Sequence, residues 1–479
     1  MTINAEHETA TTKRRAEELA HRVSGLTETD STFRDARPNP QVSAAVKHPD
    51  LSLAEVVSLI MEGYAARPAL GQRARELVTD PLGHTAFRLT PRFETITYGE
   101  LWSRAKAVAS AWYYAAHPVR AGNFVATLGF ASVDYTTLEL AVVHVGAVGV
   151  PLQSSASTSA WTAILAETEP GTLAVSIELL NTALESVLAT PSVKQVVVFD
   201  YAPAVDEQRD AFESAGKRLT GTGIALETLN AVIAHGSELP AAPLYTPDPD
   251  DDPLALLIYT SGSTGAPKGA MHSENALHRL WIREDVQAGT ENLPMINLDF
   301  LPMSHVLGRE LLITTLASGG IVYFTASGDM STLFEDISLV RPTFLVLVPR
   351  VCDMVFQRFQ TEVDRRLASG DTASAEAVAA EVKADIRDNL FGGRVLSGVV
   401  STAPLSKELR EFVASCFELH LTDAYGSTES GGVFRDGIVQ RPPVIDYKLV
   451  DVPELGYFST DKPHPRGELL LKTDGMFLG

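Results

Sequence analysis

Along this chain, segments whose apolar residues have helical spacing alternate with short runs of consecutive apolar residues. Residues 51–64, LSLAEVVSLIMEGY, space their apolar side chains like one face of an amphipathic helix. Thr97 and Glu100 form a capping-box pattern, which predicts that a helix begins there. Short buried strands are predicted at residues 124–128, 147–152, 193–200, 254–259, 296–302 and 342–349. Strands that alternate with helices indicate an α/β fold with a parallel sheet.

Two polar segments, at residues 1–50 and 239–253, interrupt the alternation of helices and strands and indicate how the chain is organised. Residues 1–50 are polar and charged, and we expect a helix at residues 13–23 followed by a loose stretch to Pro40. Residues 239–253, LPAAPLYTPDPDDDP, combine prolines and aspartates that cannot pack a core, so they predict a surface loop. We therefore expect an N-terminal extension at residues 1–50 and one core at residues 51–479.

The composition narrows the class of protein. A length of 479 residues suits about three domains of roughly 150 residues, or one large multi-sheet domain. With 39 basic and 60 acidic residues the formal net charge is −21, which argues against broad binding to nucleic acid or to an anionic membrane. The two cysteines, Cys352 and Cys416, have no paired spacing, so we expect reduced thiols. No export signal or apolar run of membrane-spanning length is visible, so we expect a cytoplasmic protein with no membrane or nucleic-acid partner.

Residues 259–270, YTSGSTGAPKGA, form a Gly/Ser/Thr loop behind a predicted buried strand. Amides and hydroxyls in such a loop can converge on phosphate oxygens, and Lys268 adds a positive charge suited to a polyphosphate. The loop is not a Walker A sequence, because Pro267 precedes the lysine and Gly269 follows it. This departure from the Walker A pattern disfavours a phosphate-loop kinase. The chain also lacks a GxGxxG fingerprint, which disfavours a nicotinamide-binding Rossmann fold. A solvated turn is the alternative to a phosphate site.

Two later segments carry residue types that suit a nucleotide site. In DAYGSTES, residues 423–430, Thr428 can offer a hydroxyl to an α-phosphate and Glu429 a hard carboxylate to Mg²⁺. In LPMSHVLGR, residues 301–309, His305 follows a predicted strand and can donate a hydrogen bond to an oxyanion. The alternatives are a polar turn in the first segment and a structural histidine in the second.

These segments together resemble the acyl-adenylate-forming superfamily. Residues 260–269 match its phosphate-loop pattern TSGSTGxPKG throughout, and residues 423–430 are similar to its YGxTE motif. STAPLS, residues 401–406, stands where many relatives carry GGAPL, with Ser401 and Thr402 in place of the glycine pair. The same residues also suit a helix N-terminus that Ser401 or Thr402 caps, with Pro404 in its first turn, and both interpretations can hold together.

The resemblance implies roles for the matching residues. The β- and γ-phosphates would be steadied by Ser261, Ser263, Thr264 and Lys268. The implied catalytic residues are His305, Thr428, Glu429 and Lys268, with Glu429 as the Mg²⁺ ligand. The implied nucleotide-binding residues are Thr260, Ser261, Gly262, Ser263, Thr264, Gly265, Lys268, His305, Ser401, Thr402, Ala403, Asp423, Ala424, Tyr425, Gly426 and Thr428.

The finer detail resembles the adenylation domain of bacterial carboxylic acid reductases. The similar stretches include LLIYTSGSTGAPKGAM, STLFEDISLVRPTFLVLVPRVCDMVF and DYKLVDVPELGYFSTDKPHPRGELLLKT. The implied fold is the large α/β core of an adenylate-forming enzyme, with mixed and parallel sheets sandwiched by helices and a distorted β-barrel-like part. The implied activity is ATP-dependent, Mg²⁺-dependent activation of a carboxylic acid to acyl-AMP, the first step of its reduction to an aldehyde.

Complete members of that family are long modular chains. A phosphopantetheine carrier domain captures the acyl group as a thioester, and a reductase domain then releases the aldehyde with NADPH. The family pattern continues beyond Gly479 with a small subdomain that bears a catalytic lysine, so we expect this sequence to be the large core alone. We expect it to bind AMP or ATP and an aromatic or medium aliphatic acid, but to turn over slowly. Its partners would be the carrier and reductase domains of the same chain.

Two other functions stay open at this stage. An acyl-CoA ligase or a peptide-synthetase adenylation domain would use the same site residues and differ in the acceptor thiol. A non-catalytic nucleotide-binding protein would keep only the binding residues. The intact Lys268, Thr428 and Glu429 argue against a decayed site.

Overall fold

Seven strands form the largest sheet of the molecule. The computed structural model describes residues 17, 19–261, 267–284, 292–326, 328–369, 374–401 and 403–479, the side chain of Ser261 excepted. The strand order is β7 (Ala225–Thr228), β6 (Gln195–Phe199), β5 (Thr172–Ser176), β3 (Phe124–Leu128), β4 (Val148–Leu152), β8 (Leu254–Ser261) and β9 (Pro267–Ser273). Neighbouring strands are parallel except for β8 and β9, which form an antiparallel hairpin.

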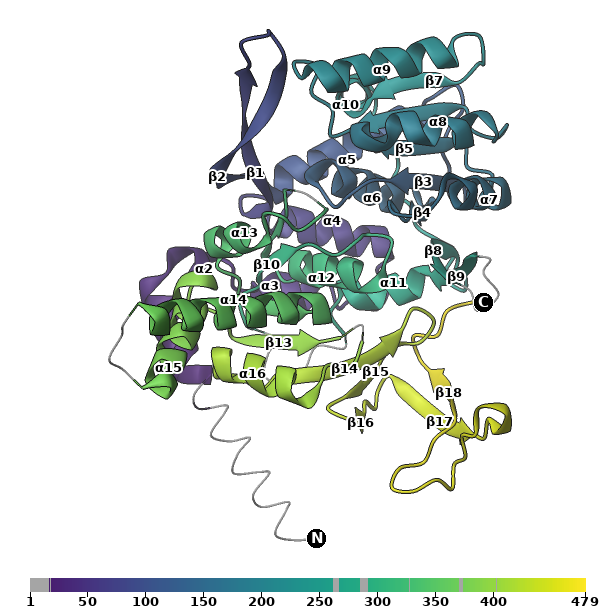
Figure 1. Cartoon of the computed structure of the whole chain (residues 1–479). Coiled ribbons are helices and arrows are strands. Elements are labelled where there is room, and N and C mark those ends of the chain that lie inside the picture. Colours follow the sequence, from purple (N-terminus) through teal and green to yellow (C-terminus); the bar gives the residue numbers. More distant parts are fainter. Residues whose placement is uncertain are drawn as a thin grey trace.

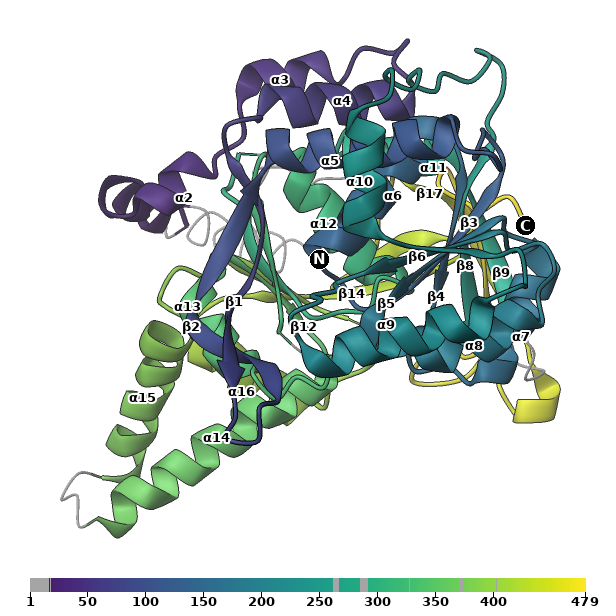
Figure 2. The same ribbon diagram turned by 90° about the horizontal axis from the view of Figure 1, so that it is seen from above.

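Helices cover both faces of this sheet (Figure 2). One face packs against α5 (Tyr98–Tyr113), α6 (Val133–Val145) and α10 (Leu229–Ser237). The other face packs against α7 (Thr158–Thr168), α8 (Leu180–Leu188) and α9 (Asp206–Leu219). Successive strand residues enter opposite cores, as Val125 and Ala126 of β3 do. Burial on both faces is the reason that these strands read as continuous apolar runs in the sequence.

Two further sheets share a second core. The four-stranded sheet has the order β10 (Ile296–Asp299), β11 (Ile321–Phe324), β1 (Pro68–Thr79) and β2 (Thr85–Thr97). The five-stranded sheet has the order β12 (Phe344–Leu347), β13 (Ser397–Val400), β14 (Leu421–Ser427), β15 (Gly431–Arg435) and β16 (Ile438–Val439). Thr343 joins the two sheets, because its amide donates to the Ile296 carbonyl at 2.9 Å and its carbonyl accepts from the Leu396 amide at 2.8 Å.

Helices and a small sheet complete the molecule. The second core is covered by α13 (Leu333–Val340), α14 (Pro349–Ala368), α15 (Ala375–Asp385) and α16 (Lys407–Phe417). The first core also takes in α4 (Leu53–Gly63), α11 (Glu274–Trp281) and α12 (Val306–Ala317). The antiparallel pair β17 (Val444–Val450) and β18 (Glu468–Thr473) lies at the lower right of Figure 1. Short helical turns occur at Ile177–Leu179, Ile386–Leu390 and Pro453–Leu455. Within the described ranges, every helix is too short or too polar to cross a membrane.

The predicted α/β fold with mixed and parallel sheets is confirmed. α5 begins after Thr97, whose side chain accepts from the Glu100 amide while the Glu100 carboxylate accepts from the Thr97 amide. The helix predicted at residues 51–64 is α4, with a second capping box between Ser52 and Glu55. Each predicted strand is present; β3 has the predicted bounds, and the other strands differ from their predicted bounds by a few residues.

The predicted loose stretch to Pro40 is wrong. Residues 19–29 are helical, and α2 (Ser31–Asp35) and α3 (Pro40–Ala45) follow directly. The carboxylate of Asp30 caps α2 at the Phe33 amide and accepts from the guanidinium of Arg394, 2.9 Å away. Because Arg394 lies far along the chain, local sequence cannot reveal that this segment is held against the second core.

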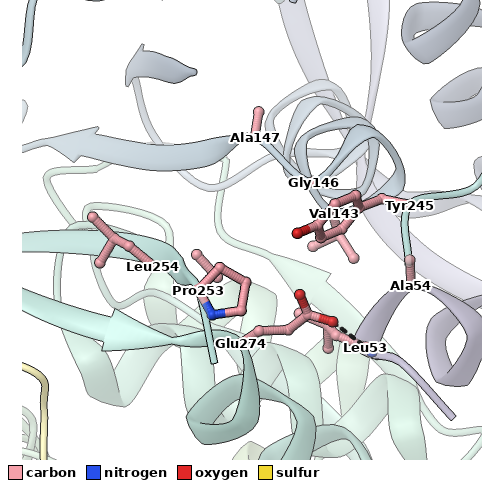
Figure 3. A pocket seen from close by; sticks show the side chains of 10 residues that line it. Leu53, Ala54, Val143, Gly146, Ala147, Tyr245, Pro253, Leu254 and Glu274 are labelled. Atoms are coloured by element: carbon pink, nitrogen blue, oxygen red, sulfur yellow. Dashed lines mark hydrogen bonds between the residues drawn. The ribbon is translucent and has the colours of Figure 1, made fainter. Parts of the chain in front are cut away.

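The predicted surface loop at residues 239–253 is partly anchored in the first core, where Ala242 is 6% exposed. Beside it lies a small cavity, in which the Glu274 carboxylate accepts from the Leu53 amide at 3.0 Å (Figure 3). The cavity lies at the amino ends of β4 and β8, the sheet edge opposite to the predicted phosphate loop. Its volume of ≈ 20 Å³ suits about one water molecule, so it is no nucleotide site.

Candidate functional site

The β8–β9 hairpin presents two predicted phosphate-binding residues at its tip. Thr260 and Lys268 are direct cross-strand partners, and the Thr260 hydroxyl donates to the Lys268 carbonyl at 3.4 Å. The Lys268 side chain is exposed, so its charge is available to a ligand. The backbone of Ser261 pairs with Pro267. Four predicted residues of the connecting loop lie outside the described residues: Gly262, Ser263, Thr264 and Gly265.

The carboxyl ends of β13 and β14 lie side by side. Val400 pairs with Asp423 in parallel register, so Ser401 continues alongside Ala424. Asp423 keeps a half-exposed carboxylate that forms an ion pair with Arg410 of α16, at 2.8 Å. One carboxylate oxygen of this predicted nucleotide-binding residue is thereby engaged by Arg410.

The described residues of STAPLS, Ser401 and 403–406, precede α16, and only the last of them takes part in the helix start. α16 begins at Lys407, and Ser406 caps it by accepting from the Leu409 amide at 3.2 Å. The predicted cap at Ser401 with Pro404 in the first turn is therefore wrong, and Thr402 lies outside the described residues. Since the cap falls to Ser406, Ser401 and Ala403 are left in the loop that follows β13.

A tight turn between β14 and β15 carries Thr428 and Glu429. The Ser427 and Ser430 hydroxyls close the turn at 2.9 Å, and both predicted ligand-binding side chains are half-buried. Ahead of the turn, Tyr425 is 53% exposed and Gly426 pairs with Gly432.

Gly426 and Gly432 provide a matched pair of substitutions. A Cβ on Gly426 would lie 2.4 Å from the Gly431 carbonyl oxygen, whereas a Cβ on Gly432 meets nothing within 4 Å. Gly426→Ala is therefore expected to distort the turn that carries Thr428. AMP binding should weaken at least about tenfold, because this is the effect of losing about one hydrogen bond to a charged group. Gly432→Ala is expected to leave binding within about twofold, since open-space surface changes alter free energies by less than about 0.5 kcal/mol. Calorimetric titration with AMP checks both, and equal effects from the two variants would contradict this account.

His305 is the N-cap of α12. Its Nδ1 accepts from the Leu307 amide at 3.2 Å. Partial burial of the ring lowers the pKa of His305, so the imidazole is neutral at pH 7. A neutral imidazole that accepts at Nδ1 carries its proton on Nε2, which can therefore donate to a ligand oxygen.

Arg309 holds the His305 segment in place, a role that sequence reasoning missed. Its Nε donates to the Met303 carbonyl at 2.6 Å, and its two Nη atoms donate to the Glu139 carboxylate of α6. The arginine and glutamate side chains are only 6% and 17% exposed. The position one helical turn after His305 was the available signal, because it places both residues on one side of α12.

A second residue that sequence reasoning missed is His272, on β9. Successive side chains of a strand alternate, so Lys268, Ala270 and His272 share one face of the hairpin. Burial lowers the pKa of His272, the Arg309 charge lowers it further, and the Glu429 charge raises it. Arg309 and Glu429 are thus the charged groups that act on the His272 ring.

The C-terminal segment connects the β14–β15 turn to the β8–β9 hairpin through backbone hydrogen bonds. The Phe477 amide donates to the Glu429 carbonyl at 3.0 Å, and the Leu478 amide donates to the Met271 carbonyl at 2.7 Å. Figure 1 shows this segment running from β18 up to β9. The hairpin and the β14–β15 turn are thus held together by the C-terminal segment.

Comparison with known proteins agrees with this architecture. The AMP-binding enzyme family matches residues 74–479. The carboxylic acid reductase of Mycobacterium tuberculosis is 51% identical over 96% of this chain and 39% of its own length, and that of Segniliparus rugosus is 46% identical over 100% and 41%. The chain thus spans about two fifths of the length of these curated relatives.

Solved structures of related adenylation domains have the same fold as this chain. The adenylation domain of the carboxylate reductase from Mycobacterium chelonae has a TM-score of 0.91 and 50% identity, over 97% of this chain and 71% of that one. The adenylation domain of the Segniliparus rugosus reductase has a TM-score of 0.90 and 45% identity, over 96% and 73%. The chain belongs to the AMP-binding enzymes and, within them, to the adenylation domains of carboxylic acid reductases.

Proposed function

We propose that this protein activates a carboxylic acid with ATP, forming acyl-AMP and pyrophosphate. The observation that carries the proposal is the backbone connection, through the C-terminal segment, between the β8–β9 hairpin that carries Lys268 and the β14–β15 turn that carries Glu429. It is further supported by the Segniliparus rugosus adenylation domain, whose structure is a complex with AMP and a co-purified carboxylic acid.

The nucleotide would lie between the hairpin tip and the β14–β15 turn. Lys268 and the loop that it follows would hold the β- and γ-phosphates, and the Thr428 hydroxyl would donate to the α-phosphate. Ser401, Ala403 and the β14 residues from Asp423 to Gly426 would border the adenosine. These side chains come from two strand ends that lie side by side.

The reaction needs positioning more than a protein nucleophile. A carboxylate oxygen of the acid forms a bond to the α-phosphorus, and the bond from that phosphorus to the bridging oxygen breaks. Pyrophosphate leaves with the electron pair, so no proton has to be transferred. The Nε2–H of His305 would donate to an oxygen of the acid or of the α-phosphate, where charge is redistributed in the transition state.

The residues present fit a magnesium ion bound together with ATP. In the parts of the chain that the structure describes, no three acidic, histidine or cysteine side chains gather as a metal site. Mg²⁺ at nucleotide sites uses one or two carboxylates plus substrate phosphates, and Glu429 supplies one such carboxylate beside Thr428. When bound, the ion would neutralise phosphate charge.

The complete protein would reduce the acid to an aldehyde. We propose that a phosphopantetheine carrier domain accepts the acyl group and that an NADPH-dependent domain releases the aldehyde. The name of the relatives and the solved adenylation–carrier didomain from Segniliparus rugosus support this proposal. Aromatic and medium aliphatic acids are the proposed substrates.

Calorimetry and mass spectrometry test the adenylation step. We expect AMP to bind, NADPH to give no heat, and benzoate with Mg·ATP to yield benzoyl-AMP under single-turnover conditions. Omission of benzoate is the control, and no acyl-AMP should form without it. Absence of both AMP binding and acyl-AMP formation would refute the proposed function.

A further inference from the structure

His272 has a buried ring nitrogen without a partner. The residue is only 9% exposed, and its Nε2 forms no hydrogen bond with the described residues. An unsatisfied buried polar atom costs about 1–3 kcal/mol, so a native protein normally provides it with a partner. Ala270, two residues earlier on the same face, is also buried and is apolar, so a polar ring at position 272 stands out on this face.

The surroundings of His272 indicate what that partner is. The residue lies four residues after Lys268 on the same strand, on the face where the nucleotide phosphates would lie. The guanidinium of Arg309 is committed to Met303 and Glu139. Glu429 is the acidic group of the proposed site whose backbone is connected to the residue before His272: the Phe477 amide donates to the Glu429 carbonyl, and the Leu478 amide donates to the Met271 carbonyl.

We propose that His272 is a positioning residue for Glu429: its Nε2–H donates to the Glu429 carboxylate when that carboxylate holds a divalent cation. This inference rests on the proposed function, in which Glu429 is the magnesium ligand. A metal-bound carboxylate keeps one oxygen free for a second hydrogen bond, which fixes its orientation. His272 supplies that bond from a strand whose position is already set by the β8–β9 hairpin.

The test measures how much Mg²⁺ strengthens the binding of ATP, and it does not depend on enzymatic activity. ATP is titrated calorimetrically into the protein with MgCl₂ and with EDTA, and the ratio of the two dissociation constants gives the coupling. Loss of an outer-shell partner lowers metal affinity by about 10- to 100-fold. His272→Leu is therefore expected to reduce the coupling ratio at least about tenfold, with ATP binding in EDTA unchanged.

Matched variants separate a positioning role from a structural one. His272→Gln keeps a donor near the Nε2 position and is expected to retain most of the coupling, whereas His272→Met removes the donor at similar length. His144→Leu is the control for loss of a buried histidine, because His144 is 4% exposed and bonds the Ala242 carbonyl far from the site. Glu429→Gln is expected to abolish the coupling.

The outcomes are distinct. Coupling that is lost in Glu429→Gln but kept in His272→Leu or His272→Met would overturn the inference about His272. Coupling that is absent from the unsubstituted protein, or kept in Glu429→Gln, would refute the proposed magnesium role of Glu429 itself. If His272→Leu does not fold, the comparison of His272→Gln with His272→Met decides, and equal coupling in those two would overturn the inference.

Discussion

Arg309→Met is expected to lower the free energy of unfolding by about 3–5 kcal/mol, because it leaves the buried Glu139 carboxylate without its cation. The substitution also removes the donor to the Met303 carbonyl and so releases the segment that carries His305. Urea unfolding at pH 7, followed by circular dichroism, measures the change. AMP binding in the absence of denaturant measures the effect on the site.

Two controls test the cause of that loss. Arg309→Met combined with Glu139→Met replaces both charges by apolar groups of similar length, and it should restore much of the stability. Arg88→Met breaks an exposed pair with Glu76, in which the side chains are 67% and 47% exposed, and should cost less than about 1 kcal/mol. If the single and the double variant lost the same free energy of unfolding, the cause would be lost packing and not the unpaired carboxylate.

Thr428→Ala is expected to weaken AMP binding by about 10- to 100-fold. A hydrogen bond to a charged group contributes about 1.5–3 kcal/mol, and each 1.4 kcal/mol changes a dissociation constant tenfold. Thr428 lies in a turn closed by the bond between Ser427 and Ser430, which does not use its hydroxyl. The melting temperature should therefore change little while the calorimetric affinity falls.

An exposed threonine outside the site serves as the control. Thr460 lies in the exposed loop between β17 and β18, and Thr460→Ala should leave AMP affinity unchanged. Unchanged affinity in Thr428→Ala would mean that the α-phosphate lies elsewhere, even if the protein binds AMP.

Local sequence patterns predicted most of the helices and strands, because interactions between residues close in the chain determine where these elements begin. The capping boxes at Ser52 and Thr97 satisfy backbone donors within four residues, so the sequence alone predicts both helix starts. The STAPLS segment shows the limit of such reasoning. Ser401, Thr402 and Ser406 are all residue types that can cap a helix, and in the structure Ser406 caps α16.

The sequence by itself determined the α/β class, the strand that leads to the loop at residues 260–269, and the residue types able to bind phosphate and Mg²⁺. These follow from periodicity and from motifs, which are contiguous in the chain. Only the tertiary structure decided that Arg309 secures the His305 segment through Glu139, and that the C-terminal segment connects the backbones of Glu429 and Met271. The physical reason is that burial and charge pairing join residues more than a hundred positions apart, and no local pattern records which distant side chains will meet.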